Sequence, residues 1–297
     1  MAERLEQFSD ALAETVAAAA KSVLRVEGRA RLAASGIAFS GDGMVLTAHH
    51  VVEQDEGLFV GIEKGEKLAA KLVGRDPATD LALLKAEGGS FPAVAWTNTP
   101  TPRVGHLVLA LGRPGASIRA TLGIVSAVGE SWRTPVGGFI DRYLQSDVVM
   151  YPGFSGGPLV SADGRFIGLN TSAVLPGASL TIPAATIERV ARELLAHGKV
   201  RRGYLGITTQ TVRLPGKIAE RLSQPTGLLI VSVESKSPAE GAGLLLGDTL
   251  LGIGDHPLRH VDDLVAELGS DRIEQEISIS VLRGGETRTV RVTVGQR

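Results

Sequence analysis

The stretch PGFSGGPLVSADGRFIGLN, residues 152–170, places one serine, Ser155, between glycines in a bend that follows an extended segment. Glycines let the backbone bring N–H groups close to a developing oxyanion without a side-chain clash, while the serine stays exposed. The residues that follow, with Ala162, Asp163 and Gly164 at the centre, predict a β-hairpin and not a helix. The stretch therefore predicts a nucleophilic serine in a β domain.

A serine hydroxyl is a weak nucleophile alone, so a base and a group that orients the base are needed elsewhere. LTAHHVV (46–52) places a histidine at the end of a predicted strand, and DPATDLALLK (76–85) places an aspartate at the start of another. The G-x-S-x-G pattern of residues 153–157 alone would equally suit an α/β-hydrolase, but there a helix follows the serine and the acid and histidine come later. The order His, Asp, Ser favours the chymotrypsin arrangement, with an esterase as the disfavoured alternative.

Composition limits the other function classes. With 297 residues the chain exceeds the usual size of one domain, and 43% hydrophobic residues with a net charge of -1 describe a globular protein without nucleic acid as a partner. The absence of cysteine excludes disulfides, thiolate metal sites and a cysteine nucleophile. No histidine has a second ligand at metal-binding spacing and no nucleotide loop is recognisable, so we expect neither a metal nor a cofactor.

The first two thirds of the chain predict a helix followed by a β domain. An alanine-rich helix is predicted over residues 5–25, and we assign residues 1–34 to an N-terminal helical segment. From Ile37 to about Ile182, short β-branched or leucine-rich runs alternate with Gly, Pro, Asp and Asn, which is typical of an all-β sandwich or barrel. The clearest strand candidates are residues 43–52, 80–86, 106–112, 122–128 and 165–171.

A second domain follows a change of hydrophobic period. TIERVARELLAHG (186–198) predicts a helix that ends at a glycine and closes a domain of residues 35–198. The boundary is predicted within the charged connector KVRRG (199–203). Residues 199–297 predict a mixed α and β domain that ends in a hairpin turning at Gly284 and Gly285.

The first residues, MAERLEQFSDALAETVAAAAKSV, do not resemble a secretory signal, because no apolar core is flanked by lysine or arginine. The alanine run is too short and too weakly apolar to span a bilayer. As given, the sequence predicts a cytoplasmic protein, or a periplasmic or other extracytoplasmic one if the N-terminus has been trimmed.

Four motifs, in order along the chain, resemble those of the HtrA/Deg family of serine proteases. They are T-x-x-H-V-V at 47–52, T-D-L-A-L-L-K at 79–85, S-G-G-P-L at 155–159 and RRGYLGI at 201–207. The resemblance covers nearly the whole chain from about residue 35. It implies a mainly β fold, with a chymotrypsin-like double β-barrel protease domain followed by an α+β PDZ domain.

The resemblance also implies a role for each residue of a triad. The family histidine stands three residues after the threonine, here Thr47, which selects His50 over His49. His50 is then expected to act as general base and general acid, and Asp80 to orient its imidazole. Ser155 is expected to be the nucleophile.

The oxyanion hole is expected in the segment Gly153, Phe154 and Ser155, with the backbone N–H groups of Gly153 and Ser155 as donors. The family usually has asparagine where this chain has Phe154. Because the donors are backbone groups, this change need not abolish activity, but a bulky ring could alter the loop or the substrate subsites.

A specificity pocket is expected at Val149, Thr171 and Ser172. In trypsin-like enzymes the acid that selects Lys or Arg lies six residues before the nucleophile, and Val149 stands there in this chain. An apolar residue at this position disfavours a cationic side chain and suits a small aliphatic one.

In the second domain, Tyr204, Leu205, Gly206 and Ile207 stand where a PDZ domain has its carboxylate-binding loop. Successive N–H groups of such a loop form a nest for a terminal carboxylate, and the bound peptide adds as a strand to a sheet edge. The resemblance predicts a helix over residues 260–269 that lines the groove.

The family implies an ATP-independent serine endopeptidase of protein quality control that cleaves unfolded or damaged proteins. Its expected partners are unfolded polypeptides, peptide C-termini at the PDZ groove, and further copies of the chain in a homo-oligomer, a trimer by analogy with the family. The alternative is a peptide-binding chaperone of the same fold, weak or inactive in catalysis, in which Phe154 distorts the oxyanion hole.

Overall fold

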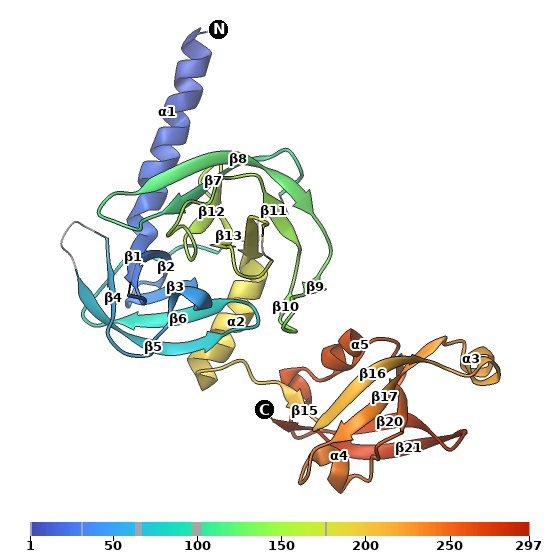
Figure 1. Ribbon diagram of the computed structural model, residues 1–297. Coiled ribbons are helices and arrows are strands. Elements are labelled where there is room, and N and C mark those ends of the chain that lie inside the picture. The colour runs from blue at the N-terminus through green and yellow to red at the C-terminus, as the bar shows by residue number, and fades with distance from the viewer. Residues whose placement is uncertain (1, 31, 63–66, 97–101, 176, 297) are drawn as a thin grey trace. The chain divides into compact units, whose positions relative to one another are not determined.

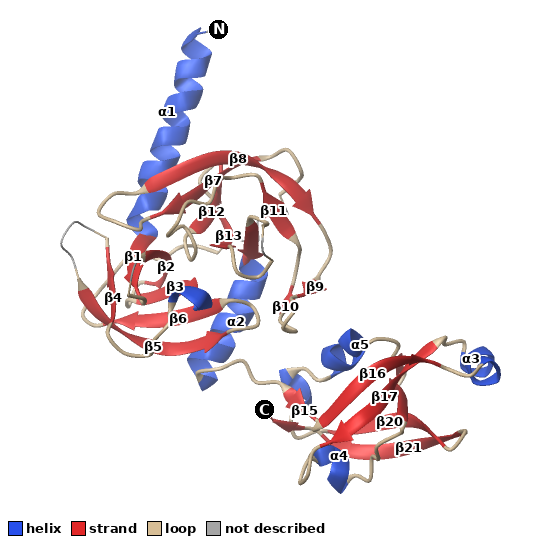
Figure 2. Cartoon of the chain, in the orientation of Figure 1, coloured by secondary structure: helices blue, strands red, loops and turns tan. Residues whose placement is uncertain are grey.

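The structure is a computed structural model that describes residues 2–30, 32–62, 67–96, 102–175 and 177–296. It divides into two compact units, residues 1–200 and 201–297, so the division lies within the connector 199–203. In both units more residues lie in strands than in helices (Figure 2).

Six antiparallel strands close a first barrel, in the order β1-β2-β3-β6-β5-β4 (Figure 1). They are β1 (Val23–Glu27), β2 (Ala34–Ser40), β3 (Met44–Ala48), β4 (Leu58–Gly61), β5 (Leu68–Asp76) and β6 (Leu81–Ala86). Barrel closure leaves no free sheet edge, which is one way in which all-β domains avoid unpaired backbone groups.

A second closed barrel has the order β11-β14-β13-β12-β7-β8. Its strands are β7 (Leu107–Gly112), β8 (Arg119–Val128), β11 (Leu144–Ser146), β12 (Pro158–Ser161), β13 (Phe166–Thr171) and β14 (Leu180–Pro183). A small ribbon of β9 (Trp132–Arg133) and β10 (Phe139–Ile140) stands between β8 and β11 in the chain. The two barrels confirm the predicted double-barrel fold.

Helix α1 (Ala2–Ala19) is shorter than the helix predicted over residues 5–25. A 3₁₀ turn at Ala20–Ser22 follows it, and residues 23–27 form β1, which pairs with β2 and β4. Valines and a leucine at the start of β1 are buried, so pairing within the barrel overrides the local helical pattern. In the described part of the chain, no helix has the length and apolar character to cross a bilayer.

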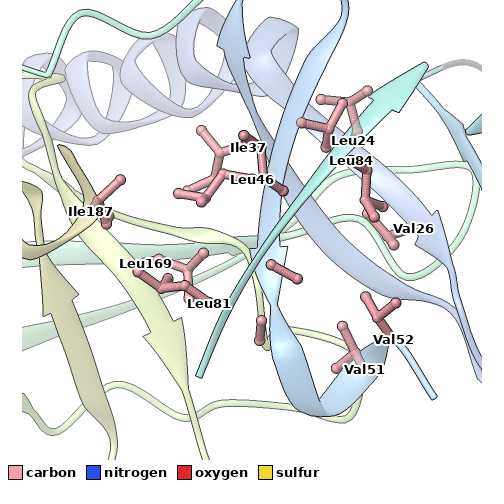
Figure 3. Close-up of a cluster of buried hydrophobic side chains, with 14 of the residues drawn as sticks. Leu24, Val26, Ile37, Leu46, Val51, Val52, Leu81, Leu84, Leu169 and Ile187 are labelled. Atoms are coloured by element: carbon pink, nitrogen blue, oxygen red, sulfur yellow. The ribbon is translucent and has the colours of Figure 1, made fainter. Parts of the chain in front are cut away.

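Helix α2 (Ala184–His197) ends the first unit, as its hydrophobic period predicts. The helix stops at Gly198, which adopts the left-handed conformation with φ of 71° and donates its N–H to the carbonyl of Leu194 at 2.8 Å. The buried side chain of Ile187 belongs to the same cluster as Leu169 on β13 and Leu81 on β6 (Figure 3). The helix is thus part of the core that joins the two barrels.

The second unit contains a sheet with the order β16-β17-β18-β20-β21, and β19 pairs with β18. Its strands are β15 (Gly203–Tyr204), β16 (Ile207–Arg213), β17 (Thr226–Val233), β18 (Thr249–Ile253), β19 (His256–Pro257), β20 (Glu276–Arg283), β21 (Glu286–Thr293) and β22 (Gly295–Gln296). Its helices are α3 (Gly216–Leu222), α4 (Pro238–Gly241) and α5 (Val261–Glu267). The turn of the last hairpin lies at Gly284 and Gly285, both with positive φ.

One buried ion pair holds the entry to β18 in this unit. Asp248 is 2% exposed and accepts from Arg283 Nε at 2.7 Å, from Arg283 Nη2 at 2.6 Å and from the N–H of Leu245 at 2.9 Å. Burial raises the pKa of Asp248, but the hydrogen bonds from Arg283 and Leu245 outweigh burial, so its pKa lies below the ordinary value.

The Asp248→Asn substitution is expected to destabilise the second unit by about 2 kcal/mol at neutral pH, because hydrogen bonds to a charged group are replaced by weaker ones. A depressed folded-state pKa contributes stability above the ordinary value of 3.8 that is lost as the pH falls through the folded-state pKa. Urea unfolding of the intact chain measures the free energy of unfolding. The difference in this free energy between wild type and Asp248→Asn should therefore become smaller below this pH.

The matched control is Asp255→Asn, which changes an exposed aspartate in the same unit. Equal unfolding free energies for the two variants at neutral pH would contradict the role assigned to the Asp248 ion pair.

Candidate active site

His50 and Asp80 are held together by two hydrogen bonds in the first barrel. His50 lies in the 3₁₀ turn His49–Val51 directly after β3, and Asp80 lies in the turn between β5 and β6. His50 Nδ1 is 2.8 Å from Asp80 Oδ2, and the backbone N–H of His50 donates to Asp80 Oδ1 at 2.9 Å. Because an ionised carboxylate only accepts, this contact places the imidazole hydrogen on Nδ1 and leaves Nε2 to accept a proton.

The carboxylate of Asp80 is itself fixed from the second barrel. Asp80 is 3% exposed, and the buried hydroxyl of Thr171, at the end of β13, donates to Asp80 Oδ2. Asp80 has a positive φ of 57°, which is uncommon for a residue other than glycine. Its carbonyl accepts the N–H of His49 at 3.0 Å. Several contacts thus hold a backbone conformation that would otherwise be unfavourable.

Asp76 shapes the turn that carries Asp80. Its carboxylate accepts the N–H of Ala78 at 3.2 Å and the hydroxyl of Thr79 at 2.7 Å. From the turn between β9 and β10, the Thr134 hydroxyl donates to the carbonyl of Ala78 at 2.7 Å. The carboxylate of Asp80 is therefore presented by a turn whose polar groups are paired on both sides.

Ser155 lies in the loop between β11 and β12, and the glycines beside it are required by space. Gly153 and Gly156 have φ of +90° and +86°. A Cβ at Gly156 would collide with the carbonyl oxygen of Ser35, and one at Gly153 would collide with Pro114. The loop can approach the first barrel this closely only because these positions have no side chain.

The hydroxyl of Ser155 has Ser172 as its partner in this structure. The two Oγ atoms are 3.2 Å apart, and Ser172 is an exposed residue directly after β13. Ser155 is half-buried and its hydroxyl faces the same cavity as the ring of His50.

The peptide groups of this loop point in different directions. The N–H of Phe154 donates to the carbonyl of Tyr151 at 3.0 Å, so that group is engaged inside the loop. Within the described residues, the N–H groups of Gly153 and Ser155 have no protein acceptor. These two groups are available to stabilise negative charge.

The ring of Phe154 points away from the cavity, into the second barrel. It is fully buried in a cluster that includes Val148 and Leu159, and it meets the ring of Tyr151 edge to face at 5.9 Å between centroids. A Cβ at position 112 would collide with this ring, so Gly112 makes room for it. The phenylalanine therefore fills core volume and does not obstruct the loop surface.

A cavity of about 740 Å³ joins the candidate base and nucleophile. Residues from both barrels line it, namely Arg29, Ala30, Leu32, His50, Glu53, Met150, Tyr151, Pro152, Gly153, Ser155 and Ser172. It has the size of an ordinary ligand site.

His49, beside the candidate base, is turned into the protein. Its Nδ1 is buried with no hydrogen-bond partner among the described residues. Burial lowers the pKa of His49 below its ordinary value, which favours the neutral ring. His50, whose ring is paired with Asp80, is the one that reaches the cavity.

In the second unit, the residues predicted to bind a peptide lead into an edge strand. Leu205 is buried and its carbonyl accepts the N–H of Ala239 at 2.9 Å, while Gly206 has a positive φ of 79°. The carbonyl of Gly206 accepts the N–H of Glu234 at 2.8 Å. Since hydrogen bonds alternate sides along an antiparallel strand, the N–H of Ile207 faces away from β17.

The edge of β16 lies beside a helix. In the described chain β16 pairs with β17 alone, and α5 contacts β16. Tyr204, in β15, donates its hydroxyl to Glu234 at 2.5 Å. The second unit thus offers an open strand edge flanked by a helix, which is the geometry of strand addition.

Comparison with known proteins assigns both units. The trypsin-like peptidase domain family matches residues 34–169, and the PDZ domain family matches residues 203–294. A solved serine endoprotease from Yersinia pestis is 30% identical, with a TM-score of 0.79 over 96% of this chain and 98% of that one. The HtrA-type protease AlgW, solved with a tripeptide, is 32% identical with a TM-score of 0.76 over 96% of this chain and 97% of that one. The chain belongs to the HtrA family of serine proteases.

Curated relatives point to the same HtrA family. A probable periplasmic serine endoprotease, DegP-like, of Pseudomonas fulva is 37% identical over 267 residues, 88% of this chain and 55% of the relative. The corresponding protein of Marinomonas sp. is 37% identical over 271 residues, 89% of this chain and 57% of the relative. The chain spans about half the length of these curated relatives.

Only one of the three residues predicted for the specificity pocket lines the cavity of this HtrA protein. Ser172 does so, whereas Thr171 is fully buried against Asp80. Val149 is 56% exposed and lies outside the lining, with its carbonyl accepting from Thr121 at 3.0 Å. Val149 was chosen by counting back six residues from Ser155, which assumes that the loop has the same length as in trypsin-like enzymes. For Thr171, the sequence gives no sign of which side chain a threonine at the end of a strand will contact.

Replacing Ser172 by alanine is expected to speed the reaction of Ser155 with a fluorophosphonate probe by about two- to threefold. Removing a competing exposed hydroxyl frees the nucleophile from a hydrogen bond worth roughly 0.5 kcal/mol. The measurement is the rate of probe labelling under pseudo-first-order conditions.

Ser90→Ala provides the control, because it removes another exposed hydroxyl that donates to a carbonyl, that of Gly41 at 2.8 Å. Labelling of the Ser172→Ala variant no faster than that of this control would show that the Ser172 contact does not restrain Ser155.

Proposed function

We propose that the chain is an ATP-independent serine endopeptidase of protein quality control that cleaves unfolded or damaged polypeptides. His50, Asp80 and Ser155 would form its triad. The observation that carries the proposal is the pair of hydrogen bonds between His50 and Asp80, at 2.8 and 2.9 Å, in a cavity that the Ser155 loop also lines.

The proposed reaction begins when the Ser155 hydroxyl leaves Ser172 and approaches His50 Nε2. His50 takes the hydroxyl proton as Ser155 Oγ attacks the scissile carbonyl, and the imidazolium that forms is stabilised by Asp80. His50 then gives this proton to the leaving amine, so that an acyl-enzyme remains on Ser155. Water, activated by the same imidazole, hydrolyses the ester and restores the serine.

The negative charge of the tetrahedral intermediates would be held by the N–H groups of Gly153 and Ser155. Both have no acceptor within the described protein, which is the state in which preorganised donors are most effective. The buried ring of Phe154 supports this assignment over the catalytically weak chaperone, because it occupies the barrel core and not the loop surface.

The substrate side chain next to the scissile bond is proposed to be uncharged. Val149, on which the sequence argument for a small aliphatic side chain was based, lies outside the cavity lining, so the proposal rests on the residues that line it. The lining from the second barrel, Met150, Tyr151, Pro152, Gly153, Ser155 and Ser172, contains no carboxylate, and the carboxylate that does line the cavity, Glu53, comes from the first barrel. A lysine or arginine side chain would find no counter-charge on this wall.

A periplasmic location is proposed from the curated relatives, which are named periplasmic endoproteases. A homo-oligomer, with a trimer as the expected form, remains a proposal from the family. The PDZ domain is proposed to bind peptide C-termini at Tyr204, Leu205, Gly206 and Ile207, supported by the open edge of β16 beside α5.

Wild-type protein is expected to cleave unfolded casein without ATP, and Ser155→Ala is expected to reduce the rate by ~10³-fold or more. Electrophoresis of timed samples measures the loss of full-length casein, with added ATP as a control that should change nothing. Binding of casein without cleavage by the wild type would favour the chaperone, and equal cleavage by the variant would exclude Ser155 as nucleophile.

The PDZ proposal predicts that a short peptide with an apolar C-terminal residue binds at least ~10-fold more tightly with a free carboxylate than with a C-terminal amide. Hydrogen bonds from backbone N–H groups to a charged acceptor are lost on amidation. Fluorescence anisotropy with the Ser155→Ala variant avoids cleavage of the probe. Equal affinity for the two peptides would show that this loop does not recognise a terminal carboxylate.

A further inference from the structure

Ser35, on β2 of the first barrel, contacts the nucleophile loop of the second barrel at two carbonyls. Its backbone N–H donates to the carbonyl of Ser155 at 3.1 Å, and its hydroxyl donates to the carbonyl of Gly153 at 2.7 Å. Ser35 is fully buried, so water does not compete for these bonds. One residue therefore holds the carbonyl groups of both proposed oxyanion-hole residues.

The direction of the Ser35 hydroxyl hydrogen is fixed by a third contact. The backbone N–H of Arg113 donates to Ser35 Oγ at 2.7 Å. Because this N–H can only donate, Ser35 Oγ accepts there, and its single hydrogen is left for Gly153. The guanidinium of Arg113 is anchored in turn, since it donates to the carbonyls of Val23 at 2.7 Å and Ala20 at 2.9 Å.

Ser35 is also tied to the strand that precedes His50. Its carbonyl accepts the hydroxyl of Thr47, on β3, at 2.7 Å. Each polar group of Ser35 is thus engaged, and its partners lie in the nucleophile loop, at the end of β7 and on β3. A serine that only fills space in the core need not connect three separate segments in this way.

The contact to Gly153 matters because of the peptide group to which that carbonyl belongs. The same peptide group carries the N–H of Phe154, which donates to Tyr151 at 3.0 Å, so the group is held at both ends. The N–H groups of Gly153 and Ser155 lie in the peptide groups on either side of it. A change in the backbone angles of Gly153, which has few steric limits, alters the angle between the peptide groups that carry these two donors unless neighbouring angles compensate for it.

From these contacts we infer that Ser35 is a positioning residue for the oxyanion hole. Its hydroxyl fixes the peptide group between Gly153 and Phe154, and its N–H fixes the carbonyl of Ser155, so that the two flanking donors keep their orientation relative to each other. The inference rests on the proposed protease function, and it assigns Ser35 no contact with the substrate.

The test compares Ser35→Ala and Ser35→Cys with Ser22→Ala in the full chain. The cysteine nearly keeps the side-chain volume but is a weak donor. Ser22 is a matched control, because it is a buried serine of the same unit whose hydroxyl donates to a carbonyl outside the loop, that of Pro92 at 2.6 Å. Three quantities are measured: kcat and KM for a peptide substrate, the Ki of a peptide boronate, and the urea midpoint.

A peptide boronate forms a tetrahedral adduct with the serine, so its affinity reports on the oxyanion hole more than KM does. We expect both Ser35 variants to lower kcat ~10-fold, below the roughly 10²–10³ that loss of an oxyanion donor itself costs. KM should stay within about twofold, and Ki should rise by a factor similar to the fall in kcat. Ser22→Ala should lower the urea midpoint about as much as the Ser35 variants do, but it should change kcat and Ki by less than about twofold.

If Ser35→Ala does not fold, Ser35→Cys decides. The inference is overturned if the folded Ser35 variant keeps kcat and Ki within twofold of Ser22→Ala, or if kcat falls without a change in Ki. Lack of cleavage by the wild type would refute the proposed function instead, so the two failures are distinguishable.

Discussion

The contact between His50 and Asp80 determines what the rest of the structure can do. One carboxylate holds His50 at two points, the backbone N–H and the ring Nδ1, and Nε2 is left as the nitrogen that can take a proton. Asp80 can serve in this way only while its unusual backbone conformation is held, by the Thr171 hydroxyl on one side and the Asp76 turn on the other. The chemistry of the cavity therefore depends on bonds in both barrels.

The double barrel provides the geometry that this contact needs. The candidate base and acid come from the first barrel, whereas the loop of the candidate nucleophile and the threonine that supports Asp80 come from the second. A core that includes Leu81, Leu169 and Ile187 joins the barrels, and buried hydrogen bonds at Ser35 cross between them. Closed barrels are rigid supports for loops, and loops carry the reacting groups.

Sequence patterns predicted much of this arrangement. Alternating strands and the glycines around Ser155 indicated a β domain, because each of these features has a local physical cause, and the order His, Asp, Ser favoured the chymotrypsin arrangement. The double barrel itself was what the family resemblance implied. The end of the first helix was placed too late, since alanine-rich sequence gives no signal that Val23 will pair in a barrel. The triad assignment came from the family resemblance, and the position of His49 is consistent with it.

Contacts that arise only in three dimensions were not predictable. The direction of the Phe154 ring depends on the space that Gly112 leaves, and Thr171 meets Asp80 across 91 positions of the chain. Ser35 lies 118 positions from Gly153, and nothing in the pattern of its strand marks it as different from another buried residue. Such pairings are set by how the barrels join and not by local sequence.

The most direct test of the central claim is to map by mass spectrometry where a serine-directed fluorophosphonate attaches, in wild-type protein and in His50→Ala. The account predicts one modified residue, Ser155, in the wild type, and almost no modification when the imidazole is removed. Modification of another serine, or equal modification of Ser155 without His50, would contradict the claim that this imidazole activates that hydroxyl.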